Sequence, residues 1–409
     1  MAFRNYAPER DKTDVLRIYR EVGWCSKTEE EEALAALFEC GRTMVAEIDG
    51  SAECAVTTDP GTIRHGTQDL PLVAVTGVTT SRVARKRGLA GRLTARVLAE
   101  EAAEGRLVSM LGVFEQGYYN QLGFGNGVYT HWCTFDPSLL TVSAMPRIPV
   151  RLGYSDWERM HAGRLRRLRG HGACNIDSAS LTRADTRWGE NGFGLGYVGD
   201  DGALTHHIWS TAKETEFGPY TVSWAAYRSK EEFLELLALV RSFEDQVRSV
   251  EMKEPPGVQL QDLLRRPFRA RQATRRSPHE NKMTAAAYWQ VRILDVPACL
   301  ARTALETDPI RFNLVLSDPI ARFLDDDAPW HGVAGDYVIE LGPQCRAVPG
   351  SEASLPTMTA SVNAFSRLWL GVRSANALAW TDELAAPPDL LERLGRGLRL
   401  PIPDPDWEF

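Results

Sequence analysis

The sequence lacks several features that would point to particular classes of protein. Its seven cysteines are scattered along 409 residues and include no CxxC pair. A disulfide framework or a structural metal site is therefore not expected, and a reduced, cytoplasmic location is the prediction. No apolar run is long enough to cross a bilayer, and the first residues, MAFRNYAPERDKTD, lack the apolar core of a signal peptide. We therefore expect a protein without a membrane span.

An excess of positive charge is also missing. The formal net charge is -7, with 47 Lys and Arg against 54 Asp and Glu, so general affinity for nucleic acid is not expected. Two arginine clusters, GRLRRLRG and RRPFRARQATRR, stand out against this acidic background. We interpret them as surfaces between domains or subunits. The hydrophobic fraction of 44% allows a core of normal size.

Prolines and the order of predicted elements divide the chain into three blocks. Residues 1–146 end at the segment MPRIP, where two prolines interrupt regular structure. Residues 147–287 contain the strand TVSWAAYR and the helix that follows it. Residues 288–409 open with YWQVRILDVPACL, a strand that turns into a helix at Asp295–Pro297. This mixture predicts an α/β (α+β) fold.

Hydrophobic periodicity predicts individual elements within these blocks. The expected helices are Thr13–Arg20, Glu29–Phe38 and Gly91–Glu104, and the expected strands are Arg42–Ile48, Leu70–Thr80, Val108–Val113 and Gly335–Glu340. The strand-then-helix order of Leu72–Glu104 is repeated at Thr221–Val250. His206 and His207 are adjacent on a strand, so their side chains should point to opposite faces and share no site.

A loop that could bind phosphate follows the strand VAVTGVTT and leads into a helix through SRVARKRGLAG. Its segment 85–90 fits R-x-x-G-x-G/A, a turn in which successive amides converge on a pyrophosphate at a helix N-terminus. The pattern alone also fits a basic helix start at the surface, but the strand and aromatic loop that follow favour a coenzyme A site. The corresponding junction in the second block, AAYRSKEEFLELL, has no glycine and two early glutamates. We therefore expect only the first copy to bind an anionic cofactor.

The segments GVTTSRVARKRGLAGRL and FEQGYYNQLGFG resemble the Gcn5-related N-acetyltransferase (GNAT) superfamily, and within it the enhanced intracellular survival (Eis) family of bacterial acetyltransferases. The resemblance covers the whole chain. It implies tandem GNAT-like domains, the first active and the second degenerate, followed by a sterol-carrier-like domain whose C-terminus is inserted in the active site. Acetyl-CoA as cosubstrate, no metal, and a homo-oligomer, typically a hexamer, are also implied. Arg82 stands where the family often has proline, and Ala90 replaces the commoner last glycine.

The resemblance also assigns the cofactor contacts. The backbone of the strand at Val78 would pair with the pantetheine arm, and an amide near Val78 would polarise the thioester carbonyl. The loop would hold the pyrophosphate. The cofactor-binding residues implied are Val78, Thr79, Thr80, Arg85, Lys86, Arg87, Gly88, Leu89, Ala90, Gly91, Phe114 and Glu115.

By this resemblance, Tyr119 matches the general acid of the family. Its phenol, with an ordinary pKa of about 10, can protonate a departing thiolate. Tyr118 is its neighbour and is expected to be a packed aromatic residue. The base implied by the resemblance is the terminal carboxylate of Phe409. We expect Trp407 and Phe409 to insert into the first domain, where burial and nearby acids would raise the α-carboxyl pKa above its ordinary value of about 3.3–3.7. A disordered tail is the alternative.

An acidic wall around this tail would favour acceptors with several amino groups, such as aminoglycosides, polyamines or lysine-bearing peptides. Trp24 and Glu408 are the candidate substrate-binding residues, whereas the run Glu29–Glu32 is interpreted as the solvated face of a helix. The function expected is acetyl-CoA-dependent N-acetyl transfer by direct attack. A non-catalytic acyl-CoA- or lipid-binding sensor or carrier is the alternative. The physiological acceptor, its reacting amine and the acyl-chain preference stay open at this point.

Overall fold

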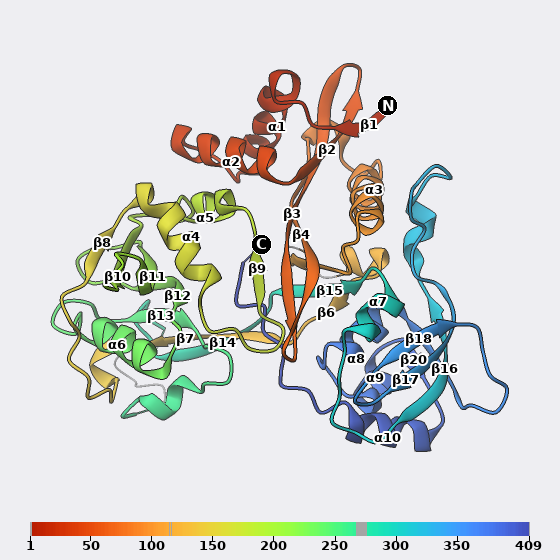
Figure 1. The fold of residues 1–409 in the computed structure, drawn as a ribbon. Coiled ribbons are helices and arrows are strands. Elements are labelled where there is room, and N and C mark those ends of the chain that lie inside the picture. Colours follow the sequence, from red (N-terminus) through yellow and green to blue (C-terminus); the bar gives the residue numbers. More distant parts are fainter. Residues whose placement is uncertain (1, 114, 116, 267–275, 409) are drawn as a thin grey trace.

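The computed structural model describes residues 2–113, 115, 117–266 and 276–408, which form three β-sheets around a central junction (Figure 1). The first sheet and its helices lie at the top of this view, the middle sheet at the left and the third sheet at the right. The long hairpin of β3 and β4 reaches from the first sheet down to the junction. Segments that are far apart in the sequence therefore meet along this hairpin.

The first sheet is mixed. Its strands in spatial order are β1 (Ala2–Asn5), β2 (Arg42–Ile48), β3 (Ser51–His65), β4 (Gln68–Thr80), β5 (Val108–Gly112), β15 (Trp289–Ile293) and β6 (Gly125–Asn126), with β9 (Cys174–Ile176) paired to β3. Its helices are α1 (Pro8–Val22), α2 (Thr28–Cys40) and α3 (Leu89–Ala103). All elements expected in the first block are confirmed. Helix α1 begins at Pro8 rather than Thr13, because proline suits the first turn of a helix.

Strands β4 and β5 diverge, which opens the first sheet. They pair in parallel only from Leu72–Val75 to Val108–Leu111 in the described ranges. Just beyond this point β4 carries a bulge opposite Val56, with Gly77 at a φ of 61°. The Tyr19 hydroxyl donates to the Gly77 carbonyl at 3.3 Å, and a Cβ at Gly77 would lie 2.2 Å from that hydroxyl. Glycine is thus required both by the backbone conformation and by the contact.

The middle sheet repeats part of this plan. Its strands in spatial order are β14 (Lys282–Ala287), β7 (Tyr129–Phe135), β13 (Val250–Lys253), β12 (Tyr220–Ala226), β11 (Leu204–Ala212), β10 (Phe193–Val198) and β8 (Val150–Leu152). Its helices are α4 (Trp157–Leu165), α5 (Ala179–Asp185) and α6 (Lys230–Arg241). As expected, the adjacent histidines have different partners. His206 contacts Glu235 at 3.1 Å, whereas His207 accepts from the Trp224 indole at 3.2 Å.

The sheets cross the block boundaries expected near residues 146 and 287. Strand β7 belongs to the first block in sequence but lies in the middle sheet, between β13 and β14. Strand β15 comes after the second block but lies in the first sheet, between β5 and β6. Prolines and turns mark where elements end, whereas pairing depends on partners far away in the chain. The expected boundaries therefore do not coincide with the sheets.

The third sheet has the order β18 (Arg346–Pro349), β17 (Gly335–Leu341), β16 (Ile310–Ser317), β19 (Thr357–Ser361) and β20 (Leu384–Ala385). Helices α7 (Val296–Ala301), α8 (Val362–Trp369), α9 (Ala375–Thr381) and α10 (Pro388–Gly397) accompany it. Its sterol-carrier-like character stays a prediction. Within the described residues, no helix combines the length and apolar character needed to cross a membrane.

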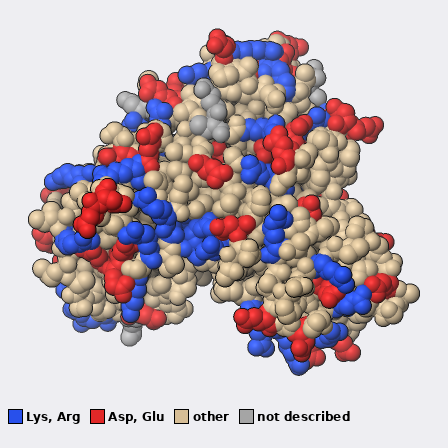
Figure 2. Space-filling model, in the orientation of Figure 1, with Lys and Arg blue, Asp and Glu red and all other residues tan. Residues whose placement is uncertain are grey.

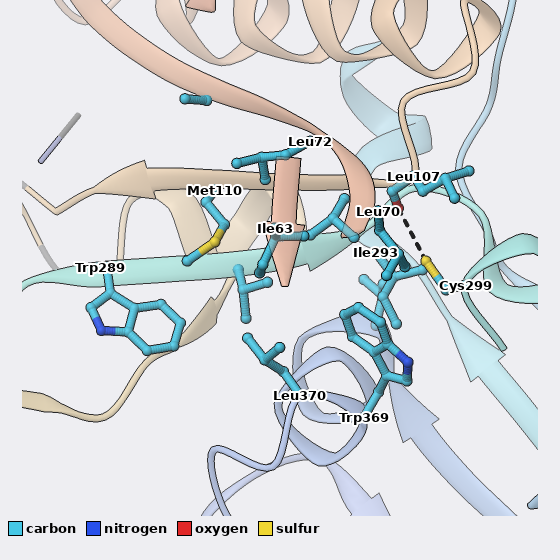
Figure 3. Close-up of a cluster of buried hydrophobic side chains, with 14 of the residues drawn as sticks. Ile63, Leu70, Leu72, Leu107, Met110, Trp289, Ile293, Cys299, Trp369 and Leu370 are labelled. Atoms are coloured by element: carbon cyan, nitrogen blue, oxygen red, sulfur yellow. Dashed lines mark hydrogen bonds between the residues drawn. The ribbon is translucent and has the colours of Figure 1, made fainter. Parts of the chain in front are cut away.

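A shared apolar core holds the regions together at the junction. Figure 3 shows Ile63, Leu70 and Leu72 of the β3–β4 hairpin above Trp369 and Leu370, which come from the end of α8 and the residue after it. All five side chains are buried. Burial of each large apolar side chain contributes about 1.5–3 kcal/mol. The hairpin is therefore anchored against the third region.

Candidate functional site

The predicted phosphate loop precedes helix α3 directly. Gly88 is the N-cap residue with a φ of 73°, and Lys86 also has a positive φ of 64°. Among the described residues no side chain caps this helix, so its first amides can receive a ligand. The side chains of Arg85, Lys86 and Arg87 are exposed, whereas Leu89 and Gly91 are buried. The loop thus combines unsatisfied amides, a helix dipole and three cations, and it fits a pyrophosphate.

The strand residues expected beside the pantetheine arm lie on β4 after its pairing with β5 has ended. Val78, Thr79 and Thr80 follow Gly77, and the buried Oγ1 of Thr79 has no hydrogen-bond partner in the described part of the chain. The Thr80 hydroxyl contacts the Cys54 thiol at 3.3 Å. The edge of β4 that faces β5 is unpaired at these residues, so it fits an extended arm that needs amide and carbonyl partners. Phe114 lies outside the described residues, and Glu115 is exposed.

Tyr119 begins the short helix η2 (Tyr119–Leu122) and is 8% exposed. Its ring packs edge-on against Tyr118 at 5.0 Å and against Phe124 at 6.3 Å. Burial raises the pKa of Tyr119, and the nearby Tyr118 and Cys54 raise it further, so the phenol keeps its proton at neutral pH. Burial also raises the pKa of Tyr118, to about 12. Both phenols can donate a proton, so the role of Tyr119 stays a prediction.

Side chains from the third part of the chain hold η2 in place, a feature that the sequence did not predict. The Asn363 amide donates to the carbonyls of Asn120 at 2.9 Å and Phe124 at 2.8 Å. Arg322 donates to the Gln121 carbonyl, and Arg292 to the Leu122 carbonyl. Arg292 is fully buried in the apolar strand β15, where it also pairs with Asp318. A lone arginine inside the run WQVRIL was the signal that could have revealed this.

Asp59 on β3 is a second residue that sequence reasoning missed. It is fully buried, and neither carboxylate oxygen has a hydrogen-bond partner in the ranges that the structure describes. Burial, followed by the nearby Asp185 and Glu101, raises the pKa of Asp59 to about 7. Burial, followed by the charge of Asp59, raises the pKa of Tyr19, whose hydroxyl donates to the Gly77 carbonyl at the bulge. Asp59 therefore interacts electrostatically both with the nearby acidic groups and with the tyrosine that contacts the bulge beside the predicted cofactor arm.

The tail lies between α4 and the first sheet. Trp407 is buried, but its ring contacts belong to α4 and the loop after it: Arg164 at 3.8 Å, Arg167 at 5.1 Å and His161 at 5.8 Å. Trp407 also belongs to the buried apolar cluster that contains Ile63, Met110 and Trp289 of the first sheet, and the insertion of the tail into the active site stays a prediction. The acidic tail is attracted to these arginines, and Asp406 forms an ion pair with Arg167 at 2.6 Å. Phe409 lies outside the described residues.

Glu408 nevertheless faces the acidic interior. Burial, followed by the nearby Asp185, raises the pKa of Glu408 to about 7. A hydrogen bond joins its side chain to Tyr288, the residue before β15. Trp24, the other candidate substrate residue, is half-buried and packs edge-on against Tyr19 at 5.6 Å. Asp185 contributes to the raised pKa of both Asp59 and Glu408, so these three carboxyl groups share one environment.

The arginine cluster GRLRRLRG forms a surface between regions, as interpreted. Arg167 pairs with Asp406 of the tail, and Arg169 pairs with Asp69 of the β3–β4 hairpin. Figure 2 shows Lys and Arg gathered where the middle region meets this hairpin. Most of the second cluster, residues 267–275, lies outside the described residues. The described part of the chain contains no group of three His, Cys, Asp or Glu residues suited to a metal ion.

Comparison with known proteins identifies the first region. The model of the acetyltransferase (GNAT) domain matches residues 4–127, whereas no curated protein matches the chain. A solved probable N-acyltransferase from Enterococcus faecalis V583 is 17% identical, with a TM-score of 0.79 over 100% of this chain and 99% of that chain. A GCN5-related N-acetyltransferase from Anabaena variabilis is 14% identical, with a TM-score of 0.78 over 100% of both chains. Eis1 from Mycobacterium abscessus is 15% identical, with a TM-score of 0.75 over 100% of both.

These structural likenesses show that the whole three-sheet fold is shared. The domain match covers β1 to β6, the part that contains the uncapped helix α3, the β4 bulge and Tyr119. Residues 4–127 thus match the acetyltransferase (GNAT) domain, which supports an acetyltransferase enzyme.

Proposed function

We propose that the protein transfers an acetyl group from acetyl-CoA to an amine of a polycationic acceptor, as an Eis-type enzyme. The observation that carries this proposal is the buried carboxyl environment of Asp59, Asp185 and Glu408 beside the β4 bulge. Asp185 pairs with Arg164 at 2.7 Å, whereas neither carboxylate oxygen of Asp59 has a hydrogen-bond partner within the described ranges. A buried carboxyl group without a cationic partner favours a ligand that brings positive charge. Aminoglycosides, polyamines and lysine-bearing peptides all have several ammonium groups.

The residues of the first region would have separate tasks in this reaction. Acetyl-CoA supplies the acetyl group as an activated thioester. The amides at Gly88 to Gly91 would bind its pyrophosphate, and the β4 edge after Gly77 would align the arm and polarise the carbonyl. Tyr119 would protonate the departing thiolate.

The acceptor must lose a proton before it attacks, since an alkylamine with a pKa of about 10.4 arrives mostly charged. By the family resemblance, the terminal carboxylate of Phe409 would take this proton. The neighbouring Glu408, whose pKa is raised to about 7, is consistent with an environment that makes carboxylates better bases. From the same resemblance we also propose a cytoplasmic location and a homo-hexamer. Sedimentation would test the hexamer.

Release of free thiol from acetyl-CoA in the presence of a panel of aminoglycosides, polyamines and lysine peptides tests the proposal. Polyamines should accelerate release far more than matched mono-amines, and acetyl-CoA should be preferred over longer acyl thioesters. Equal rates with neutral and cationic acceptors would contradict the proposed substrate class.

Replacement of the proposed acid gives the first mutational prediction. Tyr119→Phe should lower kcat by about 10²–10⁴-fold with little change in the KM for acetyl-CoA, because only the proton donor is lost. Tyr118→Phe is the matched control, since it removes the adjacent phenol. Steady-state kinetics would check this, and a larger loss in the Tyr118 variant would transfer the role to that residue.

A further inference from the structure

The middle sheet contains a cleft built like the one in the first sheet. Strands β12 and β13 pair in parallel only from Tyr220–Val222 to Val250–Met252 in the described ranges. A bulge at Ser223 interrupts the pairing of β12 with β11, in the same place as the bulge at Gly77 in β4. The gap beyond the paired residues therefore corresponds to the proposed arm-binding edge of the first sheet.

The tail of the chain occupies this second cleft. One cavity is lined on one side by Val222–Ala225 of β12 and on the other by Met252–Pro255, at and beyond the end of β13. The remaining lining comes from Arg164, Tyr227 and the tail residues 406–408. The Arg164 guanidinium lies over the Trp407 ring at 3.8 Å and over the Trp224 ring at 4.5 Å. The Arg164 guanidinium thus makes cation–π contacts with the buried Trp407 ring of the tail and with the Trp224 ring of β12.

The main chain of the tail is also bound. The Pro405 carbonyl accepts from the Cys174 amide at 2.8 Å, and the Asp406 carbonyl accepts from Arg167 at 2.9 Å. The Asp404 amide donates to the His171 carbonyl at 3.1 Å. These partners lie on β9, which pairs with β3 of the first sheet, and on the segment between α4 and β9, so the tail is held between the cleft and the first sheet.

The charges of the tail and its cleft are complementary. Asp404 pairs with Lys253 at 2.5 Å, and Asp406 pairs with Arg167 at 2.6 Å. These cations come from the strand side and the helix side of the cleft. An acidic peptide with one aromatic ring matches this arrangement, because charge-assisted bonds flank an apolar slot.

We propose that the cleft between β12 and β13 is a peptide-binding site for an acidic, aromatic segment, and that the chain's own residues 403–408 are its ligand. A strand gap that binds a cofactor arm in the first region here binds protein. Trp407 is the anchor, and the docked segment fixes Glu408 beside Tyr288 and Asp185. The site does not depend on the proposed reaction.

Hydrogen exchange of the full-length chain tests the proposal without any substrate. The Cys174 amide reports docking directly, because its bond partner is the tail carbonyl of Pro405. Trp407→Ala should speed exchange at Cys174 at least tenfold, and added free indole should reverse this. Ile402→Ala is the control within the tail, since Ile402 is 76% exposed, and it should leave exchange unchanged.

Exchange of the charges of Asp404 and Lys253 provides a second test. Both side chains are partly exposed, so the substitutions should preserve folding. Asp404→Lys should speed exchange at Cys174, and the added substitution Lys253→Asp should restore protection. Restoration in the pair would support the site. Equal protection of Cys174 in the wild type, Trp407→Ala and Asp404→Lys chains would overturn the proposal, as would a failure of both indole and the charge exchange to restore protection.

Discussion

The cleft between β4 and β5 and the cleft between β12 and β13 have the same strand plan but different helix starts. Helix α3 begins at Gly88, follows three exposed cations and has no side-chain cap from the part of the chain that the structure describes. Helix α6 begins after Ser229, whose hydroxyl accepts from the Glu232 amide. Its first turn also contains Glu231 and Glu232. The second helix start therefore uses its own amides and repels anions.

This difference indicates how a duplicated cleft can change its ligand. The start of the helix beside each strand gap decides whether a phosphate can bind there. In the middle region the arginines of α4 and the loop after it attract an acidic tail instead. The third region serves both clefts, since it positions η2 beside the first and supplies the tail to the second.

Reversal of charge at the first helix start should have the largest effect on cofactor binding. The double variant Arg85→Glu/Arg87→Glu imitates the acidic start of α6 and should raise the KM for acetyl-CoA about 10- to 100-fold, because each reversal replaces attraction to phosphate by repulsion. Lys230→Glu at the exposed start of α6 is the control. Initial rates at several salt concentrations would measure this, and an unchanged KM would separate the loop from phosphate binding.

Adding a single methyl group at Gly77 tests whether the bulge of β4 requires glycine. Gly77→Ala places a Cβ 2.2 Å from the Tyr19 hydroxyl and forces alanine into a positive φ, which costs about 1–2 kcal/mol before the clash is counted. We expect kcat/KM to fall at least about tenfold, with a lower Tm. Gly50→Ala is the matched control, because Gly50 has a φ of 88° but nothing within 4 Å of its Cβ position. Equal losses in both variants would mean that strain alone matters.

Local features of the first cleft were predictable, whereas its surroundings were not. The loop before α3 and the strand β2 are encoded by contiguous residues, so glycine position and periodicity were sufficient. Asp59 and Pro60 lie inside the 15-residue strand β3, where an Asp-Pro-Gly sequence is more typical of a turn. Pairing with β4 and β9 overrides that preference.

The position of the tail was unpredictable for a different reason. Aromatic residues at a chain end predict burial but do not name the surface that buries them. The cluster at residues 163–170 showed that a partner surface existed, yet its acidic partner is more than 200 residues away, at Asp406. Likewise, the exchange of β7 and β15 between sheets depends on pairings that no local pattern contains.

The support of η2 by the third region should matter for turnover more than for cofactor binding. Asn363→Ala removes two hydrogen bonds to the carbonyls that flank Tyr119, so we expect kcat to fall roughly 3- to 10-fold while the KM for acetyl-CoA stays the same. Asn313→Ala is the matched control, because Asn313 also donates to two carbonyls, those of Glu352 and Leu355. Both variants should lose similar stability. A similar loss of kcat in the control would exclude a specific effect on η2.

The last comparison concerns stability rather than turnover, at a buried acidic residue whose counterpart in the middle sheet is uncharged. In the strand register Asp59 faces Ala74, and the equivalent position in the middle sheet is Ala212, which faces Tyr220. The pKa of Asp59 is raised to about 7 in the folded chain, against about 3.9 in an unfolded one. The folded state therefore holds this proton more tightly, and stability falls as pH rises from about 4 to 7.

Asp59→Asn keeps the shape of the protonated acid but cannot ionise, so it should not show this loss. The variant should match the wild type near pH 4 and exceed its stability by about 2–4 kcal/mol at pH 8, measured by urea denaturation. A difference that is the same at both pH values would mean that Asp59 stays charged in the fold. The gain should come with a weaker preference for polyamines over mono-amines, because the same unpaired carboxylate that destabilises the empty protein would stabilise a bound cation.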